Sequence, residues 1–332
     1  NFVAIPFFYV RRGDRPPDTQ LITIVSICDL TLLYEARQVA IGYPSGPLSF
    51  AFFLDENYEV ANLTALHHLI HSYMHNITNV HDITVGIMAI NTSNTFYKRI
   101  YSKFQFNART PLQHRIPTNA LRNLAEAQVS TDWLFNIDID FWYLSDTLKN
   151  EDDFVRIIEN MNSIINETQF DAHTVFIVPA FEIIEHEDEA VHFDYSSVSR
   201  KQLLDLVYLE EISPFHVHAQ AQRCTNYREW YAADRPYVLD LRDTRRGACH
   251  YGFEPWFIML TSVSRQRQYQ WDTRYIGRGL NKVERVYKFR HFCFNFIVLH
   301  DAFMIHARDS VVSHGVDNVS EADTKKWYAI ED

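Results

Sequence analysis

The stretch FNIDIDF, residues 135–141, places two carboxylates one residue apart inside an otherwise apolar run. Asp138 and Asp140 repel each other unless a cation lies between them, and each loses hydration in a buried position. An oxygen-rich pair of this kind suits Mg²⁺ or Mn²⁺, with a substrate diphosphate completing the coordination shell. The D-x-D pattern is also common by chance, and the alternative is that one aspartate caps a helix and the other is solvated.

Alternating strands and helices are expected to position this pair. Apolar, β-branched runs predict buried strands at residues 21–30, 46–54, 82–90, 132–141 and 173–181. Helical spacing predicts helices at residues 31–43, 62–77, 117–130 and 154–166. This order predicts an α/β fold with a largely parallel sheet. Ligands of such sheets bind beyond the carboxyl ends of the strands, so both aspartates are expected to face a cleft if their strand ends at Ile139.

Composition narrows the class of protein. The 332 residues are 47% hydrophobic, which is enough for one large core, and no repeat or linker divides them. The formal charge of -11, without a basic block, argues against a nucleic acid partner. No apolar run reaches the roughly 20 residues that span a bilayer. The chain begins without Met, which is compatible with removal of an upstream targeting or anchoring segment.

Cysteines and glycosylation sequons bear on the compartment. Four widely spaced cysteines form no C-x-x-C pair, so a structural zinc site is not predicted, and disulfides are allowed but not required. Five N-x-[ST] sequons favour the secretory lumen. They begin at Asn62, Asn76, Asn91, Asn166 and Asn318.

The segment at residues 116–141, IPTNALRNLAEAQVSTDWLFNIDIDF, resembles the signature of glycosyltransferase family 49. In that family a helix bearing N-x-x-R-N leads into a strand that ends in D-x-D. Six further segments resemble the family's motifs in the same order, and they are GPLSFAFFL, FIVPAFE, TNYREW, FEPWFIM, WDTRYIGRGLNKV and FIVLHDAFMIHA. The ordered set, over roughly residues 20 to 310, is more specific than any one motif.

The resemblance implies a GT-A-type nucleotide-sugar-binding domain of the LARGE type or the β-1,4-glucuronyltransferase type. Its expected limits are residues 21–310, with an N-terminal extension at 1–20 and a C-terminal tail at 311–332. The implied reaction is inverting transfer of a sugar, such as glucuronic acid, from a UDP-sugar to a glycan or glycoprotein acceptor in the Golgi or endoplasmic reticulum. Mn²⁺ or Mg²⁺ would bind to Asp138, Asp140 and, as third ligand, His306.

Further site residues follow from the matched motifs. Inversion needs one general base near the acceptor hydroxyl, and the candidates are Glu182 and Asp272, level with each other, followed by Glu254. We expect five polar residues at the donor, namely Asn119, Arg122, Asn123, Asn281 and Lys282. Arg122 could hold a phosphate or a uronate carboxylate through its planar fork. The alternative roles are a salt-bridged strand-end carboxylate for Glu182, a cap beside Pro255 for Glu254 and a turn cap for Asp272. For Arg122 the alternative is an ordinary helix-surface side chain.

Departures from the family pattern gather around the same cleft and keep a second hypothesis open. The late histidine continues as HARDS where the family has M-P-H, and Leu280 replaces a tryptophan. The alternative is therefore a catalytically degenerate glycosyltransferase-like subunit, a scaffold that binds protein partners in a larger, organelle-targeted complex. A glycoside hydrolase is disfavoured, because two carboxylates in D-x-D are too close to flank a glycosidic bond.

Overall fold

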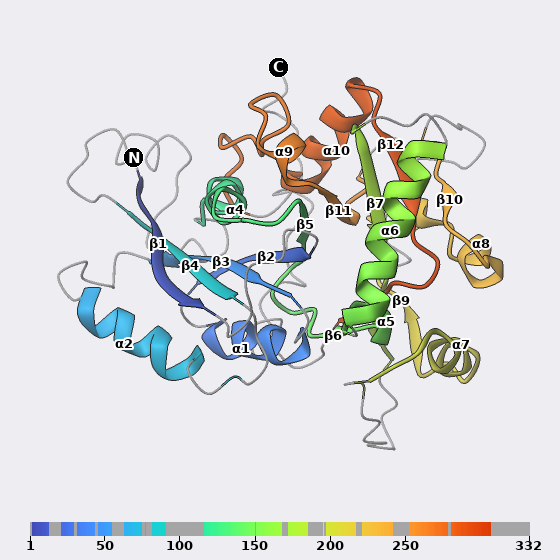
Figure 1. Ribbon diagram of the computed structural model, residues 1–332, viewed down its shortest axis with the longest axis horizontal. Helices are drawn as coiled ribbons and strands as arrows, with labels where there is room; N and C mark the ends of the chain where they lie inside the picture. Colours follow the sequence, from blue (N-terminus) through green and yellow to red (C-terminus); the bar gives the residue numbers. More distant parts are fainter. Residues whose placement is uncertain are drawn as a thin grey trace, which may run out of the picture.

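The computed structural model describes most of the chain (Figure 1). The described residues are 2–12, 21–29, 32–43, 46–54, 63–74, 77, 82–90, 116–149, 151–167, 172–184, 195, 197–216, 221–241, 252–277 and 280–306. The predicted C-terminal tail at residues 311–332 lies outside them. So do four of the sequon residues, Asn62, Asn76, Asn91 and Asn318.

A sheet of nine strands runs through the described part of the chain, in the order β1-β4-β3-β2-β5-β11-β7-β12-β10. The strands are β1 (Phe2–Arg12), β2 (Ile22–Asp29), β3 (Leu48–Leu54), β4 (Asp82–Ile90), β5 (Trp133–Asn136), β7 (Thr174–Val178), β10 (Tyr237–Val238), β11 (Trp256–Leu260) and β12 (Asn295–Val298). Strands β4, β3, β2, β5, β7 and β12 run in one direction, and β1, β11 and β10 run against them. The predicted α/β fold with a mostly parallel sheet is confirmed.

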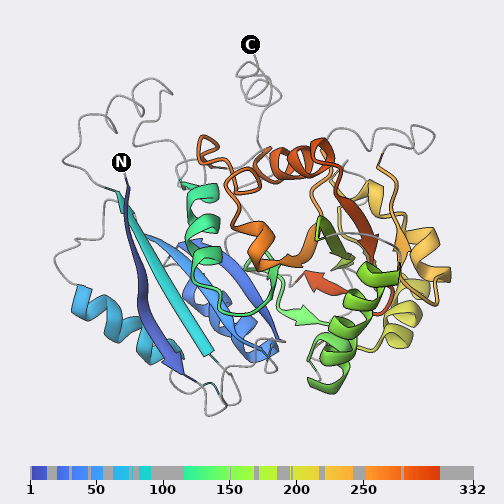
Figure 2. The same cartoon turned by 45° about the horizontal axis from the view of Figure 1, so that its top comes forward.

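Helices cover both faces of this sheet. They are α1 (Leu33–Gly42), α2 (Leu63–Met74), α4 (Thr118–Ala127), α5 (Asp146–Lys149), α6 (Glu151–Glu167), α7 (Arg200–Tyr208), η4 (Arg223–Thr225), α8 (Tyr227–Ala232), α9 (Thr261–Ser264) and α10 (Asn281–His291). Figure 1 shows α1 and α2 below the first strands and α4 above them, and Figure 2 shows the same elements from a view turned by 45°. Because side chains alternate along a strand, Phe50 and Phe52 of β3 join the core under α1 and α2, whereas Ala51 and Phe53 join the core under α4. Burial on both faces explains the continuous apolar runs in the sequence.

A second sheet of four short strands lies beside the first, in the order β6-β13-β8-β9. Its strands are β6 (Tyr143–Leu144), β8 (Ala180–Ile183), β9 (Ile212–Pro214) and β13 (Met304–His306). β13 pairs in parallel with β8 and antiparallel with β6, and β9 pairs antiparallel with β8. The sequence does not predict this sheet, because strands of two to four residues are too short to show a period.

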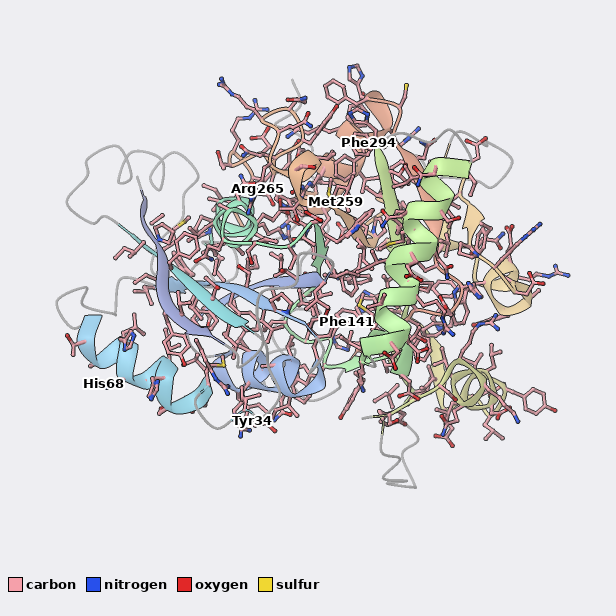
Figure 3. All side chains as sticks on the ribbon, in the orientation of Figure 1. Tyr34, His68, Phe141, Met259, Arg265 and Phe294 are labelled. Carbon is pink, nitrogen blue, oxygen red and sulfur yellow. The ribbon has the colours of Figure 1, made fainter. Side chains whose placement is uncertain are left out.

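The strand that carries the two aspartates is shorter than predicted. β5 ends at Asn136, not at Ile139, and the next residues form a turn in which the Phe141 N–H donates to the Asp138 carbonyl at 3.2 Å. The apolar residues of the turn stay buried, and Phe141, at 1% exposure, lies near the middle of the molecule in Figure 3. Asp138 and Asp140 are 33% and 36% exposed. Leaving the strand lets both carboxylates keep part of their hydration, which a buried strand would remove.

Strand β1 occupies the segment that the sequence sets apart as an N-terminal extension. It pairs antiparallel with β4 from Phe2 to Arg12, and its register shifts between Ile5 and Tyr9. Phe7, inside this irregularity, has φ 53°, and its N–H donates to the Gln128 side chain of the α4 C-cap at 2.8 Å. The sequence gives no strand signal here, because Pro6 interrupts a short apolar run.

Two further expectations concern the membrane and the cysteines. Among the described helices, none combines the length and apolar character that crossing a bilayer requires. Cys28, Cys224 and Cys293 are free thiols, and Cys249 lies outside the described residues.

Candidate active site

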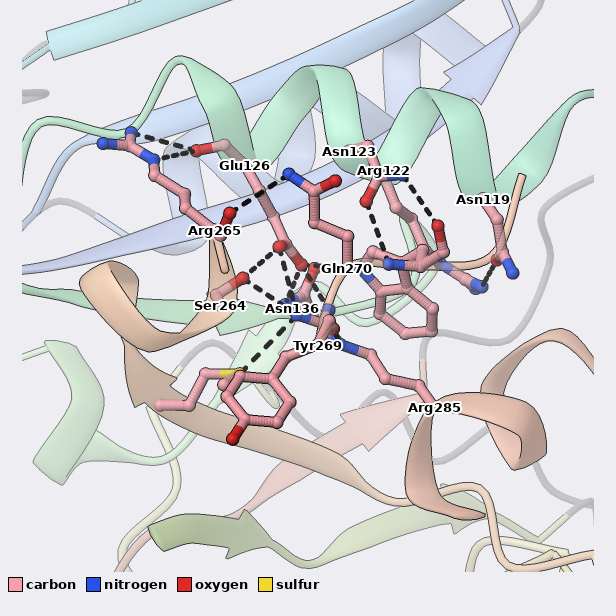
Figure 4. A network of polar contacts seen from close by, with 12 residues as sticks. Asn119, Arg122, Asn123, Glu126, Asn136, Ser264, Arg265, Tyr269, Gln270 and Arg285 are labelled. Atoms are coloured by element: carbon pink, nitrogen blue, oxygen red, sulfur yellow. Dashed lines mark hydrogen bonds and ion pairs between the residues drawn. The ribbon is translucent and has the colours of Figure 1, made fainter. Parts of the chain in front are cut away.

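A buried carboxylate, Glu126 of α4, ties together the elements around the site (Figure 4). It is 2% exposed and pairs with Arg285 of α10, which is fully buried, at 2.5 Å between Oε1 and Nη1. Glu126 also accepts hydrogen bonds from Trp271 Nε1 at 2.6 Å, from Asn136 Nδ2 at 3.0 Å and from the Ser264 hydroxyl. Burial raises the pKa of Glu126, but the charge and hydrogen bonds of Arg285 outweigh it and leave the pKa lowered. The network fixes α4 against α10 and the end of β5.

One helical turn earlier, Arg122 connects the same helices to Asp138. Its Nη1 donates to Asn119 Oδ1 at 3.1 Å and to Asn281 Oδ1 at 3.2 Å. Its guanidinium lies over the Trp271 ring, 4.5 Å from the centroid, and its Nη2 is 3.6 Å from Asp138 Oδ1. Burial lowers the pKa of Arg122, and the charge of Asp138 acts against this shift. Arg122 is thus a buried support for Asp138.

Lys282, the second residue of α10, is the other cation at Asp138. Its Nζ forms an ion pair and hydrogen bond with Asp138 Oδ2 and lies 4.3 Å from the centroid of the Trp256 ring. Trp256 Nε1 donates to the same oxygen at 3.3 Å. The negative charge of Asp138 is therefore compensated by two cationic side chains of the protein itself.

Asp140 has a different partner, His306 of β13. His306 Nε2 lies 3.1 Å from Asp140 Oδ2. The other carboxylate oxygen, Oδ1, is buried and has no hydrogen-bond partner among the described residues. The His306 ring packs against Phe141 and Phe215, with centroids 5.2 Å and 5.0 Å away. A carboxylate with an unsatisfied oxygen beside an imidazole nitrogen fits a divalent cation.

The three predicted ligands do not surround one point. Within the described residues, no group of three His, Cys, Asp or Glu side chains is arranged to hold a metal ion. Asp140 and His306 are brought together, whereas Asp138 is turned toward Lys282 and Arg122. The structure therefore groups Asp140 with His306, and Asp138 with Lys282 and Arg122.

Glu182 lies beside this pair in the small sheet. In the parallel pairing of β8 and β13, Glu182 is the register partner of His306. Its side chain is 30% exposed, and its Oε1 accepts a hydrogen bond from the His216 main-chain N–H at 3.0 Å. Glu182 is therefore a partly exposed carboxylate at the register position of His306 in the small sheet.

Comparison with known proteins identifies the family. The family model described as "Glycosyl-transferase for dystroglycan" matches residues 21–329. The chain belongs to glycosyltransferase family 49. The resemblance inferred from the seven ordered motifs is therefore confirmed.

Relatives of this family 49 chain are long proteins. It is 27% identical over 216 residues to "Xylosyl- and glucuronyltransferase LARGE2s" of Danio rerio, a match over 65% of the chain and 24% of that protein. It is 28% identical over 213 residues to "Xylosyl- and glucuronyltransferase LARGE1" of Homo sapiens, over 64% and 24%. The chain thus spans about a quarter of the length of these relatives. A solved structure titled "Crystal structure of GalNAc-T7 with UDP, GalNAc and Mn2+" aligns with a TM-score of 0.41 at 9% identity, over 87% of this chain and 44% of the other.

The other two base candidates of the family 49 motifs have structural contacts. Both carboxylate oxygens of Asp272 accept hydrogen bonds from the Arg274 side chain, and Asp272 Oδ1 also accepts the Arg274 main-chain N–H at 3.0 Å. These hydrogen bonds lower the pKa of Asp272. Glu254 lies two residues before the start of β11, and its charge acts on Arg122 by raising the pKa of that guanidinium. Asp272 therefore caps its own turn, which is the alternative to its predicted role as a base.

Three of the five predicted donor residues also make hydrogen bonds within the protein. Asn123 exchanges two hydrogen bonds with the main chain of Trp271, at 2.8 and 3.0 Å. Asn119 donates to the Asp272 carbonyl at 3.0 Å, and Asn281 donates to the Gly277 carbonyl at 2.9 Å. These three asparagines brace the segment between β11 and α10. The two charged residues among the five, Lys282 and Arg122, both lie at the Asp138 carboxylate.

The sequence reasoning missed Glu126 and Arg285. Glu126 had a usable signal: it follows Arg122 by four residues, so both lie on one face of α4, and that face also carries the buried Leu121 and Ala125. A charged pair on the apolar face of a helix indicates a buried polar network. Nothing in the spacing links Glu126 to Arg285, which is 159 positions away in the chain.

Proposed function

We propose that this chain transfers a sugar from a UDP-sugar to a hydroxyl of a glycan acceptor, with inversion and with a divalent cation held by Asp140 and His306. The observation that carries the proposal is the Asp140 carboxylate: its Oδ1 is buried without a hydrogen-bond partner among the described residues, and its Oδ2 lies 3.1 Å from His306 Nε2. When bound, Mn²⁺ or Mg²⁺ would offset the charge that develops on the leaving diphosphate. Membership of family 49 supports the same reaction class.

Asp138 and Lys282 serve the donor in this proposal. Lys282 lies in the first turn of α10, where the helix dipole also favours an anion. A diphosphate would compete with Asp138 for the ammonium, because charge-assisted hydrogen bonds to phosphate oxygens are strong. Arg122 keeps Asp138 in place during this exchange. Its guanidinium is itself held beside that carboxylate, because it donates hydrogen bonds to Asn119 and Asn281.

Glu182 acts as the general base. The acceptor hydroxyl gives its proton to the Glu182 carboxylate, and the hydroxyl oxygen bonds to the anomeric carbon of the donor. The bond from that carbon to the diphosphate oxygen breaks, and its electron pair leaves with UDP. Asp272 is a poorer base, because Arg274 lowers its pKa and donates hydrogen bonds to both of its carboxylate oxygens.

The donor sugar and the compartment are proposed from the relatives. Proteins named xylosyl- and glucuronyltransferases match this chain over about two thirds of its length, which supports UDP-glucuronate or UDP-xylose as donor. The sequons and the resemblance to the family support the lumen of the Golgi or the endoplasmic reticulum, where glycan acceptors are found.

The test is titration calorimetry of UDP with the purified protein, with Mn²⁺ or with chelator, followed by a donor screen for UDP release. We expect Mn²⁺-dependent UDP binding, release from one donor, and loss of the metal dependence in Asp140→Asn. Asp205→Asn, at an exposed position of α7, is the matched control. UDP affinity that does not respond to Mn²⁺ in the parent protein, with no release from any donor, would reject the enzyme and favour the scaffold.

A further inference from the structure

The carboxylate of Glu182 is contacted by two parts of one residue, His216. The His216 main-chain N–H donates to Glu182 Oε1 at 3.0 Å, and the His216 ring places Nε2 3.9 Å from Oε2. The two carboxylate oxygens of Glu182 therefore lie near two different groups of His216, its main-chain N–H and its ring. A side chain with several rotatable bonds becomes ordered when both ends of its terminal group have a neighbour.

The local backbone explains why His216 reaches this position. β9 pairs with β8 through Pro214 opposite Phe181, and the Phe215 N–H donates to the Ala180 carbonyl at 2.9 Å. The chain then turns at His216, whose φ is 47°. A left-handed conformation is costly for a residue with a side chain, and it persists where its surroundings hold it.

The His216 ring is held by stacking. Its centroid lies 4.0 Å from that of Phe215, with an angle of 11° between the planes. Phe215 in turn packs against His306, at 5.0 Å, and against Trp256, at 5.4 Å. A continuous set of rings therefore runs from the neighbour of Glu182 to the neighbour of Asp140.

We infer that His216 is a positioning residue, which sets the Glu182 carboxylate at the acceptor hydroxyl. The inference rests on the proposed function, in which Glu182 is the base. The His216 side chain is 58% exposed, so its conformation is not required by core packing. Its ring contact with Oε2 limits rotation of the carboxylate, while the main-chain hydrogen bond holds Oε1.

His216→Phe isolates the role of the ring nitrogen, because phenylalanine keeps the stacking on Phe215 and replaces the nitrogen that faces Oε2 with a C–H group. We expect kcat for transfer to fall between about 10-fold and 100-fold, as a small displacement of a reacting group can cost that much. The KM for the donor and the affinity for UDP with Mn²⁺ should change less than about twofold. His216→Gln, whose amide N–H has a similar reach, should recover part of kcat.

The matched control is His68→Phe. His68 projects from α2, in a part of the molecule distant from Phe141 in Figure 3, and should leave kcat unchanged. Crystal structures of the parent and of His216→Phe give a readout that does not depend on turnover. The Glu182 carboxylate should occupy one position in the parent and move or become multiple in the variant.

The outcomes separate this inference from the proposed function. A parent protein that turns over no donor and binds no UDP rejects the proposed function, and the two crystal structures still decide whether His216 positions Glu182. An unmoved carboxylate in His216→Phe overturns the inference, as does a parent-like kcat. A fall in kcat that His216→Gln does not recover points to a general structural defect and also overturns it.

Discussion

The ammonium group of Lys282 pairs with the carboxylate of Asp138, although 144 positions separate the two residues in the chain. The pair joins the first turn of α10 to the turn after β5. Trp256 completes it from β11, with its ring under the ammonium and its N–H directed at the same carboxylate oxygen. Three segments that are distant in the sequence thus meet at the Asp138 carboxylate. Their contacts hold the Lys282 ammonium group in one position before any donor binds.

Replacement of Lys282 by methionine should weaken UDP binding in the presence of Mn²⁺. The variant removes one charge-assisted contact, worth about 1.5–3 kcal/mol, which corresponds to a loss of affinity of roughly 10-fold to 150-fold. Calorimetry at two salt concentrations measures the effect, because the lost term is electrostatic. Lys201→Met, at an exposed position of α7, is the control, and equal affinities for both variants would contradict the role of Lys282.

His306→Phe should abolish the Mn²⁺ dependence of UDP binding and leave the fold intact. Phenylalanine preserves the ring contacts with Phe141 and Phe215 but offers no nitrogen to a cation. Circular dichroism and the midpoint of thermal unfolding check the fold, and calorimetry with Mn²⁺ and with chelator checks the metal dependence. His291→Phe, at an exposed position near the end of α10, should behave as the parent does. Retained Mn²⁺ dependence in His306→Phe would remove His306 from the proposed ligands.

Glu126→Gln should destabilise the whole domain. The substitution leaves the fully buried Arg285 without its charge partner, and breaking such a pair costs about 3–5 kcal/mol. Urea unfolding measures the free energy of unfolding. Glu159→Gln, at an exposed position of α6, should change this free energy by no more than about 0.5 kcal/mol. A similar small effect at Glu126 would show that the network is not needed to hold α4 against α10.

The same pair predicts the response to acid. The pKa of Glu126 is lowered in the folded state from its ordinary value of 4.5, so its stabilising contribution is fully present above that value and is lost as the pH falls through the lower, folded-state value. The free energy of unfolding of the parent should therefore approach that of Glu126→Gln as the pH is lowered below 4.5. Urea unfolding at a series of pH values tests this, and a difference that stays constant with pH would rule it out.

The strands buried on both faces were predictable because the side chains of each strand pack into two hydrophobic cores, one on each face of the sheet. Phe50 and Phe53 of β3 belong to opposite cores, and this requirement leaves a continuous apolar run that is visible in the sequence. The short strands β6, β8, β9 and β13 leave no such run. The antiparallel insertion of β11 between β5 and β7 is equally hidden, since a pairing partner cannot be read from the period of one strand.

The residues of the candidate site were predictable where they belong to a family motif. Their orientations were not predictable, because these depend on contacts between segments that are distant in the sequence. The order of the family 49 motifs indicated that Asp140 and His306 belong to one site, and the structure brings them to 3.1 Å. The orientation of Asp138 depends instead on Lys282 and Arg122, which approach it from two helices. His216 had no signal, because its position depends on one left-handed residue in the turn after β9.

The pairing of β1 with β4 has a practical consequence for shortened versions of this protein. The family match begins at residue 21, so a fragment cut there would follow the family limit and still lack β1. Its β4 would then display unpaired N–H and C=O groups along an open edge, beside the apolar run DITVGIMAI. Open edges of this kind recruit strands from other molecules. A fragment that starts at residue 21 should self-associate more than the chain that includes β1, because residues 2–12 cover this edge of β4.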